Sequence, residues 1–299
     1  MHKYVLSDLK VESEFEFLVA TPSDFSCVPD VTIKFQDDIG RPENPLVTDK
    51  LLIAKPQDLW FYGERDLSFR VRNGNEILIE KGAFVTDQDI NLYLVGSAFG
   101  VVCLQRGLMP MHCSAVEFDG KAVAFTGASG VGKSTLAAAL SQMGYQHVCD
   151  DVFIVNLESD PVTVAAMPKG LKLWDHAAEA LEIARGKRVS SNPDFTKSYV
   201  TVAETSTSPR LLFDTLYVMD EEDAEEFKIT ELTGGHKLSE IRRAIYREEW
   251  LNYISDKGAV FAQVVELAKV IRVYSFKRRD DLSLVRESAQ HLISHFTKR

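Results

Sequence analysis

An eight-residue segment near the middle of the chain constrains the fold more than any other part of the sequence. Residues 127–134 read Gly-Ala-Ser-Gly-Val-Gly-Lys-Ser, and they lie between an apolar run at 122–125 and an Ala/Leu-rich run at 136–140. The pattern G-x-x-x-x-G-K-[ST] between a strand and a helix is typical of a phosphate-binding loop, or P-loop. We therefore expect a buried strand that ends at Thr126 and a helix from Ser134 to Met143.

The strand before this loop is expected to pair with its predecessor as an antiparallel hairpin. Two apolar segments, Cys113 to Phe118 and Lys121 to Thr126, flank Asp119-Gly120, a pair typical of a two-residue turn. In a doubly wound sheet, the strand before a P-loop instead has parallel neighbours that are reached through helices. The sequence therefore predicts a mixed α/β fold whose P-loop architecture differs from the doubly wound one.

The P-loop predicts binding of a nucleoside triphosphate, taken to be ATP, together with Mg²⁺. Its glycines let backbone N–H groups face phosphate oxygens, and the N-terminus of the following helix adds positive potential. Lys133 is expected to reach the β and γ phosphates, and the hydroxyl of Ser134 is expected to bind magnesium. The expected nucleotide-binding residues are Gly127, Ala128, Ser129, Gly130, Val131, Gly132, Lys133, Ser134 and Thr135.

Two adjacent carboxylates follow the P-loop at a spacing that suits catalysis. Asp150 and Asp151 lie 16 and 17 residues beyond Ser134, within a segment from Tyr145 to Leu157 that is predicted as one strand. A helix followed by a return strand brings this pair back to the phosphate site. Neighbouring residues of a strand point to opposite faces, so one carboxylate can hold magnesium while the other accepts a proton from an attacking hydroxyl.

His112 immediately precedes the predicted hairpin. A single histidine is more often structural than catalytic, so its position alone favours a structural role.

The chain is expected to divide into a β-rich N-terminal domain (1–86) and a P-loop domain (87–299). The first part reads as short strands separated by turns, with a hairpin from Leu67 to Glu80 around Asn73-Gly74. A helix is predicted to begin at the N-cap Asp87 and to end at Gly107. Further helices are predicted at 239–254 and 280–297, and the acidic run 220–226 is predicted to be a solvated loop.

Charge and composition exclude several kinds of partner. The formal net charge is −10, which disfavours attraction to nucleic acid or to an anionic membrane. We find neither a secretory signal nor the roughly 18 uncharged apolar residues that span a bilayer, so a cytoplasmic location is expected. The four cysteines form no CxxC pair and are expected to be buried, reduced thiols.

His112, the P-loop and the pair Asp150-Asp151 together resemble the catalytic domain of HPr kinase/phosphorylase, whose P-loop fold is shared with ATP-type phosphoenolpyruvate carboxykinases. The resemblance covers about residues 107–157 and continues more weakly through 170–174. It implies that Asp150 is the base toward an acceptor serine, that Asp151 joins Ser134 at magnesium, and that His112 tunes the acid pair. The catalytic residues implied are Asp150, His112 and Lys133.

The sequence departs from the bifunctional HPr enzymes at two points. Thr135 stands where those enzymes usually carry Glu, and their later E-R-G signature is absent from the sequence. The stretches 105–116 and 170–174 look more like HPr-kinase-related proteins encoded with lasso peptides, some of which phosphorylate the C-terminal serine of a precursor peptide. The resemblance thus implies an ATP-dependent serine kinase that acts on a peptide or small protein.

Two other functions remain open, a small-molecule kinase or carboxykinase and a nucleotide-sensing regulator without transfer activity. We expect the β-rich N-terminal part to hold an extended acceptor peptide by strand addition, and assembly into a homo-oligomer is left open. Several basic residues could bind phosphate or a peptide carboxylate, although such charges more often lie on a solvated surface. They are Arg185, Lys187, Arg188, Lys197, Arg210 and Arg247, the last on the helix predicted near Ser239.

Overall fold

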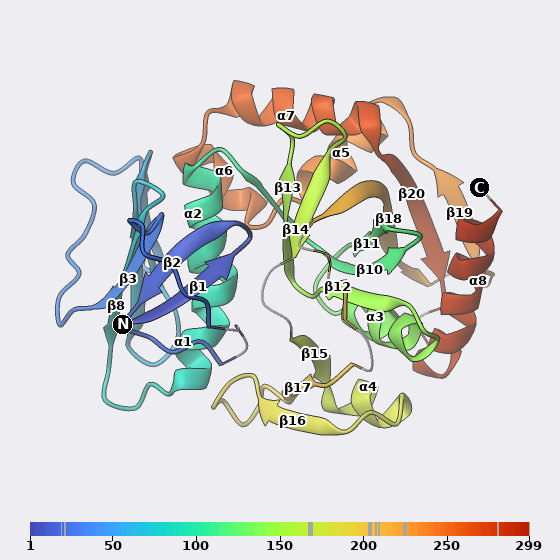
Figure 1. Cartoon of the computed structure of the whole chain (residues 1–299), viewed down its shortest axis with the longest axis horizontal. Coiled ribbons are helices and arrows are strands. Elements are labelled where there is room, and N and C mark those ends of the chain that lie inside the picture. Colours follow the sequence, from blue (N-terminus) through green and yellow to red (C-terminus); the bar gives the residue numbers. More distant parts are fainter. Residues whose placement is uncertain are drawn as a thin grey trace.

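The computed structural model of the chain describes residues 1–18, 20, 22–166, 170–202, 205–206, 208, 210–223, 226–279 and 281–298. These residues form the predicted mixed α/β fold, with three β-sheets and helices between and around them (Figure 1). The first sheet lies at one end of the molecule, and the P-loop belongs to the large central sheet.

The first sheet is built from the N-terminal part of the chain, in the order β1-β2-β3-β8-β7-β6-β5-β4. Its strands are β1 (His2–Leu6), β2 (Leu9–Ser13), β3 (Val31–Phe35), β4 (Val47–Thr48), β5 (Leu52–Lys55), β6 (Asp58–Tyr62), β7 (Leu67–Arg72) and β8 (Glu76–Lys81). The hairpin predicted around Asn73-Gly74 is confirmed, because β7 and β8 pair antiparallel and both turn residues have positive φ angles of 52° and 61°.

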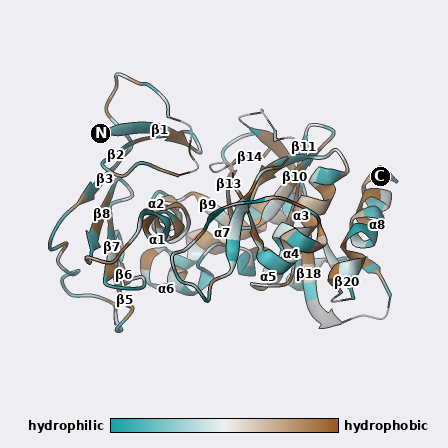
Figure 2. Cartoon of the chain, turned by 90° about the horizontal axis from the view of Figure 1, so that it is seen from below, coloured by the Kyte–Doolittle hydropathy of each residue, from teal (hydrophilic) through white to brown (hydrophobic). Residues whose placement is uncertain are grey.

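A helical layer joins the first sheet to the central sheet. It consists of α1 (Asp87–Tyr93), the π-helical turn η1 (Leu94–Ala98) and α2 (Phe99–Gln105). The N-cap is Thr86, one residue before the predicted Asp87, because Thr86 and Asp89 form a reciprocal capping box. Every residue of α2 is buried, and one hydrophobic core extends from the first sheet through this layer to the central sheet (Figure 2).

The central sheet has the strand order β12-β10-β11-β18-β14-β13-β9, and β20 and β19 extend it beside β18. Its strands are β9 (Met109–His112), β10 (Ser114–Phe118), β11 (Lys121–Thr126), β12 (Gln146–Cys149), β13 (Val152–Asn156), β14 (Thr163–Ala166), β18 (Leu211–Asp223), β19 (Lys228–Glu231) and β20 (Arg272–Arg278). The predicted β10–β11 hairpin is confirmed, and β11 also pairs in parallel with β18.

The predicted helix after the P-loop is α3 (Lys133–Gln142), which packs against α8 (Val285–Thr297) and is almost entirely buried. A third, small sheet then lies beside α3. It is formed by β15 (Leu171–Trp174), β17 (Lys197–Val200) and β16 (Arg185–Arg188) in that order, with α4 (Asp175–Ala180) following β15. This sheet was not predicted, since its strands are only four residues long.

Three predicted elements were wrong in their extent. The strand expected from Tyr145 to Leu157 is broken at Asp150-Asp151, where Asp151 has a φ of +79°. The acidic run is not a loop at its start, because residues 220–223 continue β18, and 224–225 lie outside the described residues. The helix expected at 280–297 begins later, since the turn η3 (Leu282–Leu284) precedes α8.

The helix predicted at 239–254 is replaced by several shorter elements. These are α5 (Gly234–Arg243), the turn η2 (Glu248–Trp250) and α6 (Leu251–Ile254), and the unpredicted α7 (Lys257–Val270) follows them. The helix is interrupted because the segment 244–246 pairs with β9: the His112 amide donates to the carbonyl of Ala244 at 2.6 Å, and the Tyr246 amide donates to that of Pro110 at 2.8 Å. We call residues 244–246 the strap.

Cys27 is exposed, contrary to the expectation, whereas Cys103, Cys113 and Cys149 are buried, and all four thiols are free. Among the described residues, no helix combines the length and the apolar character needed to cross a membrane. The domain boundary at 86/87 stays a prediction, since the hydrophobic core is continuous across it.

Candidate active site

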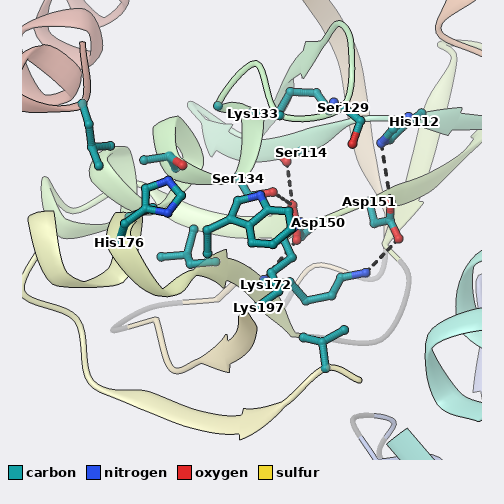
Figure 3. A pocket seen from close by; sticks show the side chains of 18 of the residues that line it. His112, Ser114, Ser129, Lys133, Ser134, Asp150, Asp151, Lys172, His176 and Lys197 are labelled. Atoms are coloured by element: carbon teal, nitrogen blue, oxygen red, sulfur yellow. Dashed lines mark hydrogen bonds and ion pairs between the residues drawn. The ribbon is translucent and has the colours of Figure 1, made fainter. Parts of the chain in front are cut away.

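A cavity of about 310 Å³ lies between the P-loop, the break after β12 and the third sheet (Figure 3). It brings together most of the residues that the sequence singled out. Those that line it are His112, Ser129, Gly130, Gly132, Lys133, Ser134, Thr135, Asp150, Asp151 and Lys197. Gly127, Ala128 and Val131 belong to the same loop but do not line the cavity.

The backbone of the P-loop has the form that a phosphate cradle needs. Gly127 has a φ of +139°, and a Cβ atom there would lie 2.6 Å from the carbonyl oxygen of Met219, so only glycine fits. At Gly130, with a φ of +92°, a Cβ atom would meet nothing within 4 Å, so the loop faces open space there. The loop thus combines a closely packed base with an open face toward the cavity.

Lys133 is held inside the P-loop by backbone carbonyls. The residue is only 7% exposed, and Nζ donates to the carbonyl oxygens of Gly127 at 2.8 Å and Ala128 at 2.9 Å. Burial lowers the pKa of Lys133, and the nearby carboxylates Asp150 and Asp151 offset only part of this effect. The lysine is therefore a buried cation whose two acceptors are both neutral.

Asp150 anchors Ser134 of the P-loop. Its Oδ1 accepts hydrogen bonds of 2.7 Å from both the Ser134 and the Ser114 hydroxyls, and its Oδ2 accepts one of 3.1 Å from the backbone amide of Lys172. The resemblance paired Asp151 with Ser134, whereas the structure places Asp150 against that hydroxyl. This contact does not test the roles predicted for the two aspartates. It favours the opposite assignment, with Asp150 near magnesium and Asp151 near the acceptor.

Asp151 faces a different set of partners. Its Oδ2 accepts a hydrogen bond of 2.8 Å from Lys172 Nζ, and its Oδ1 lies 3.5 Å from His112 Nε2 (Figure 3). Burial alone would raise the pKa of Asp151, but the charge and hydrogen bond of Lys172, together with the charges of His112 and Lys197, outweigh burial and hold this pKa well below its ordinary value. Asp151 therefore stays ionised.

His112 lies at the end of β9, next to the strap. Burial lowers the pKa of His112, and the charge of Asp151 offsets this only in part, so the imidazole is neutral at pH 7. The ring of Tyr246 meets it edge-on, with centroids 5.6 Å apart and an interplanar angle of 73°. A Cβ atom on Gly96 would lie 2.7 Å from the Tyr246 hydroxyl, so the π-helical turn leaves room for this tyrosine.

The cavity is basic although the chain as a whole is acidic. Four basic residues line it, Lys133, Lys172, Lys197 and Arg278, against the two carboxylates Asp150 and Asp151. The excess of positive charge suits a polyanionic ligand such as a triphosphate. Arg278 lies across the P-loop, where its Nη2 donates to the carbonyl oxygen of Val131 at 2.6 Å.

Most of the other basic residues predicted as binding candidates have partners elsewhere. Arg185 and Arg188 form ion pairs of 3.2 and 3.0 Å with Asp175, and Arg210 forms one of 2.9 Å with Asp8. Lys187 is exposed on β16. Arg247 follows the strap rather than lying on a helix, and its guanidinium donates to Ser97 at 2.7 Å.

Among the residues that line the cavity, Ser114, Lys172, Tyr246 and Arg278 were given no role from the sequence. Ser114 and Lys172 lie within stretches that carry the resemblance, whereas Tyr246 and Arg278 lie outside the recognised motifs and reach the cavity through the strap and through strand pairing. The one usable signal was the alternation of Leu171-Lys172-Leu173-Trp174, which predicts that Lys172 and Trp174 share a face.

The donor set suits magnesium that arrives with a nucleotide. Within the described part of the chain, no group of three or more His, Cys, Asp or Glu side chains could hold a metal ion by itself. Magnesium at nucleotide sites commonly takes one or two protein oxygens, and phosphates and waters complete its coordination. Ser134 and Asp150 supply such oxygens side by side, next to a loop that fits phosphates.

No protein-family profile matches the sequence, and no curated protein sequence matches it. Among solved structures, the HPr(Ser) kinase/phosphatase from Coxiella burnetii is similar to this chain, with 13% sequence identity and a TM-score of 0.35. The match covers 63% of this chain and 91% of that chain.

Proposed function

We propose that this chain is an ATP- and magnesium-dependent kinase that transfers the γ-phosphate to a serine hydroxyl of a peptide or small protein. The observation that carries the proposal is the meeting of two half-sites in one basic cavity. The P-loop with Ser134 and Asp150 forms the nucleotide half, and Asp151 with His112 forms the acceptor half. Phosphoryl transfer needs little beyond positioning, charge neutralisation and a group that orients the acceptor.

The nucleotide half would work by an exchange of hydrogen-bond partners. Lys133 Nζ leaves the two loop carbonyls and donates to β- and γ-phosphate oxygens, which are charged and therefore stronger acceptors. Backbone amides at the N-terminus of α3 bind the remaining phosphate oxygens. Ser134 and Asp150 are the residues that would hold magnesium, which neutralises phosphate charge when it is bound.

The acceptor half would orient the attacking hydroxyl. Asp151 is ionised and lines the cavity, so it can accept a hydrogen bond from the serine hydroxyl. His112 is neutral at pH 7 and lies 3.5 Å from Asp151, so the pair can take up the proton that the hydroxyl releases. This assignment exchanges the roles that the resemblance implied, because Asp150 already accepts hydrogen bonds from Ser134 and Ser114.

The cavity constrains how an acceptor reaches the site. From the helical layer, Leu92 of α1 lines the cavity, and no described residue of the first sheet does so. The first sheet can therefore bind an acceptor peptide only at a distance from the reacting atoms. The acceptor end of the cavity is bounded instead by Trp174 and Lys197 of the third sheet and by Phe195, which lies just before β17.

Transfer of label from γ-labelled ATP tests the proposal. Acceptors would include a peptide with a C-terminal serine, as in a lasso precursor, an internal-serine peptide, an HPr-type protein and hydroxylated metabolites. We expect label on a serine peptide or small protein, and we expect loss of transfer in Asp151→Asn with nucleotide binding retained. Label only on a metabolite would establish a small-molecule kinase, and binding without transfer to any acceptor would establish a nucleotide sensor. Cytoplasmic location and oligomeric state remain predictions.

A further inference from the structure

Among the described residues, Lys172 donates hydrogen bonds to both aspartates. Its Nζ donates to Asp151 Oδ2 at 2.8 Å, and its backbone amide donates to Asp150 Oδ2 at 3.1 Å. The side chain is 12% exposed, so the ammonium has little access to water. The ammonium of Lys172 thus contacts Asp151, and the neutral backbone amide of the same residue contacts Asp150.

The direction of this side chain is fixed by the third sheet. Lys172 is opposite Tyr199 in the antiparallel β15–β17 pair, and the Tyr199 hydroxyl accepts a hydrogen bond of 2.9 Å from Asn91 of α1. Leu171 and Leu173, on the other face of β15, are each 1% exposed. Because alternate residues of a strand face opposite sides, burial of the two leucines directs Lys172 into the cavity.

This arrangement makes Asp151 a poor ligand for a divalent cation. Its Oδ2 is occupied by the ammonium, and any ion bound to the other oxygen would lie close to that positive charge in a partly buried site, where repulsion is weakly screened. Asp150 differs, because its partners are all neutral, namely the hydroxyls of Ser134 and Ser114 and a backbone amide. The acid pair therefore offers one carboxylate to a metal ion, and the other is neutralised by Lys172.

We propose that Lys172 acts in place of a second divalent ion, so that the nucleotide-loaded site holds a single Mg²⁺ at Ser134 and Asp150. The ammonium of Lys172 then meets the transferring phosphoryl group from β15, while Lys133 meets it from the P-loop. Asp151 is a partner of Lys172 and of the acceptor, not a metal ligand. The inference rests on the nucleotide-binding part of the proposed function.

Counting bound Mn²⁺ by electron paramagnetic resonance, with adenylyl imidodiphosphate as the non-hydrolysable nucleotide, tests the proposal without any turnover. We expect a single Mn²⁺ per nucleotide-loaded chain. Asp150→Asn should weaken Mn²⁺ binding by about tenfold or more, as expected when an oxygen partner of a metal is lost. Asp151→Asn, the matched change one residue away, should leave the affinity for Mn²⁺ unchanged.

Removing the charge of Lys172 provides a second test of the proposal. In Lys172→Met, Asp151 is released and should bind an additional Mn²⁺, which the double variant Lys172→Met/Asp151→Asn should lose. Thermal unfolding shows whether these variants fold. If they do not fold, the comparison of Asp150→Asn with Asp151→Asn in the wild-type background tests the proposal instead. Two Mn²⁺ in the wild-type chain, or equal weakening by the two aspartate variants, would overturn the proposal. A single ion in a chain that transfers no phosphate would overturn the kinase function alone.

Discussion

Replacing Lys133 with methionine removes a charge while keeping most of the side-chain volume. In the structure Lys133 is 7% exposed, and its ammonium donates to two neutral carbonyl oxygens. Burial lowers the pKa of Lys133, which means that folding disfavours the protonated form. The charge is therefore unfavourable for stability at pH 7 and is useful only when phosphate is bound.

The magnitude follows from the bonds exchanged on binding. Two hydrogen bonds to phosphate oxygens contribute about 1.5–3 kcal/mol each, because the groups are charged. The two carbonyl bonds given up each contribute about 1 kcal/mol, which leaves a net loss of roughly 1–4 kcal/mol in the variant. This corresponds to a Kd for Mg-ATP that is about 5- to 900-fold higher. The melting temperature without nucleotide should be equal to or above that of the wild type.

Titration calorimetry with Mg-ATP, together with thermal unfolding with and without nucleotide, measures both effects. Lys121→Met is a matched control, since Lys121 forms an ion pair with Asp214 at the opposite end of β11 and its side chain is 47% exposed. The control should keep the wild-type Kd. Wild-type affinity in a folded Lys133→Met chain would refute the P-loop assignment. A lower melting temperature in the absence of nucleotide would refute the argument about the buried charge.

Three further predictions concern the elements around the site. Gly96→Ala places a Cβ atom 2.7 Å from the Tyr246 hydroxyl, and in steady-state assays it should lower kcat and leave the affinity for Mg-ATP unchanged. The control Gly235→Ala, whose Cβ atom meets nothing within 4 Å, should change neither kcat nor this affinity. Hydrogen bonds from Ser191 and Thr86 hold the pKa of Asp89 at about 2 against the opposing effect of burial. Asp89 therefore contributes about 2 kcal/mol to the free energy of unfolding above pH 4, and this contribution should be lost as the pH falls toward 2. In denaturant unfolding, Asp89→Asn should lose less stability over this pH range than the wild type. An identical loss of stability in the two proteins would contradict this. A chain that begins at Asp87 should not unfold cooperatively, because α2 would lose the first sheet that buries it, and a sharp calorimetric transition would show otherwise.

The parts of the site that could be predicted are those fixed by local chemistry. The P-loop needs glycines at special φ angles and a lysine and a serine at the start of a helix, and this requirement is visible in eight consecutive residues. The turns at Asn73-Gly74 and Asp119-Gly120 are also local, because both residues of each pair have positive φ angles. The strand, loop and helix at 121–142 therefore followed from the sequence.

The residues that could not be predicted reach the cavity through contacts distant in sequence. Tyr246 is placed by the strap on β9, more than 130 residues away, and Arg278 by the parallel pairing of β20 with β18. The strap has an apolar pattern compatible with a helix, but pairing with an open sheet edge satisfies its backbone instead. Tertiary contacts of this kind override local propensity, and a single sequence does not reveal them.

The two aspartates face different partners, as expected, but for a different reason than the one predicted from the sequence. We expected Asp150 and Asp151 to diverge because they were placed within one strand, whose successive side chains point to opposite faces. They diverge because the strand ends: Asp151 has a φ of +79°, a conformation that is unfavourable for a residue other than glycine. This turn points its carboxylate toward Lys172 and His112, and the 2.8 Å ion pair with Lys172 offsets the backbone strain. Asp151 is thus held away from Ser134 by Lys172, which lies 21 positions later in the sequence. Lys172 belongs to β15, a strand whose pairing no local sequence pattern specifies.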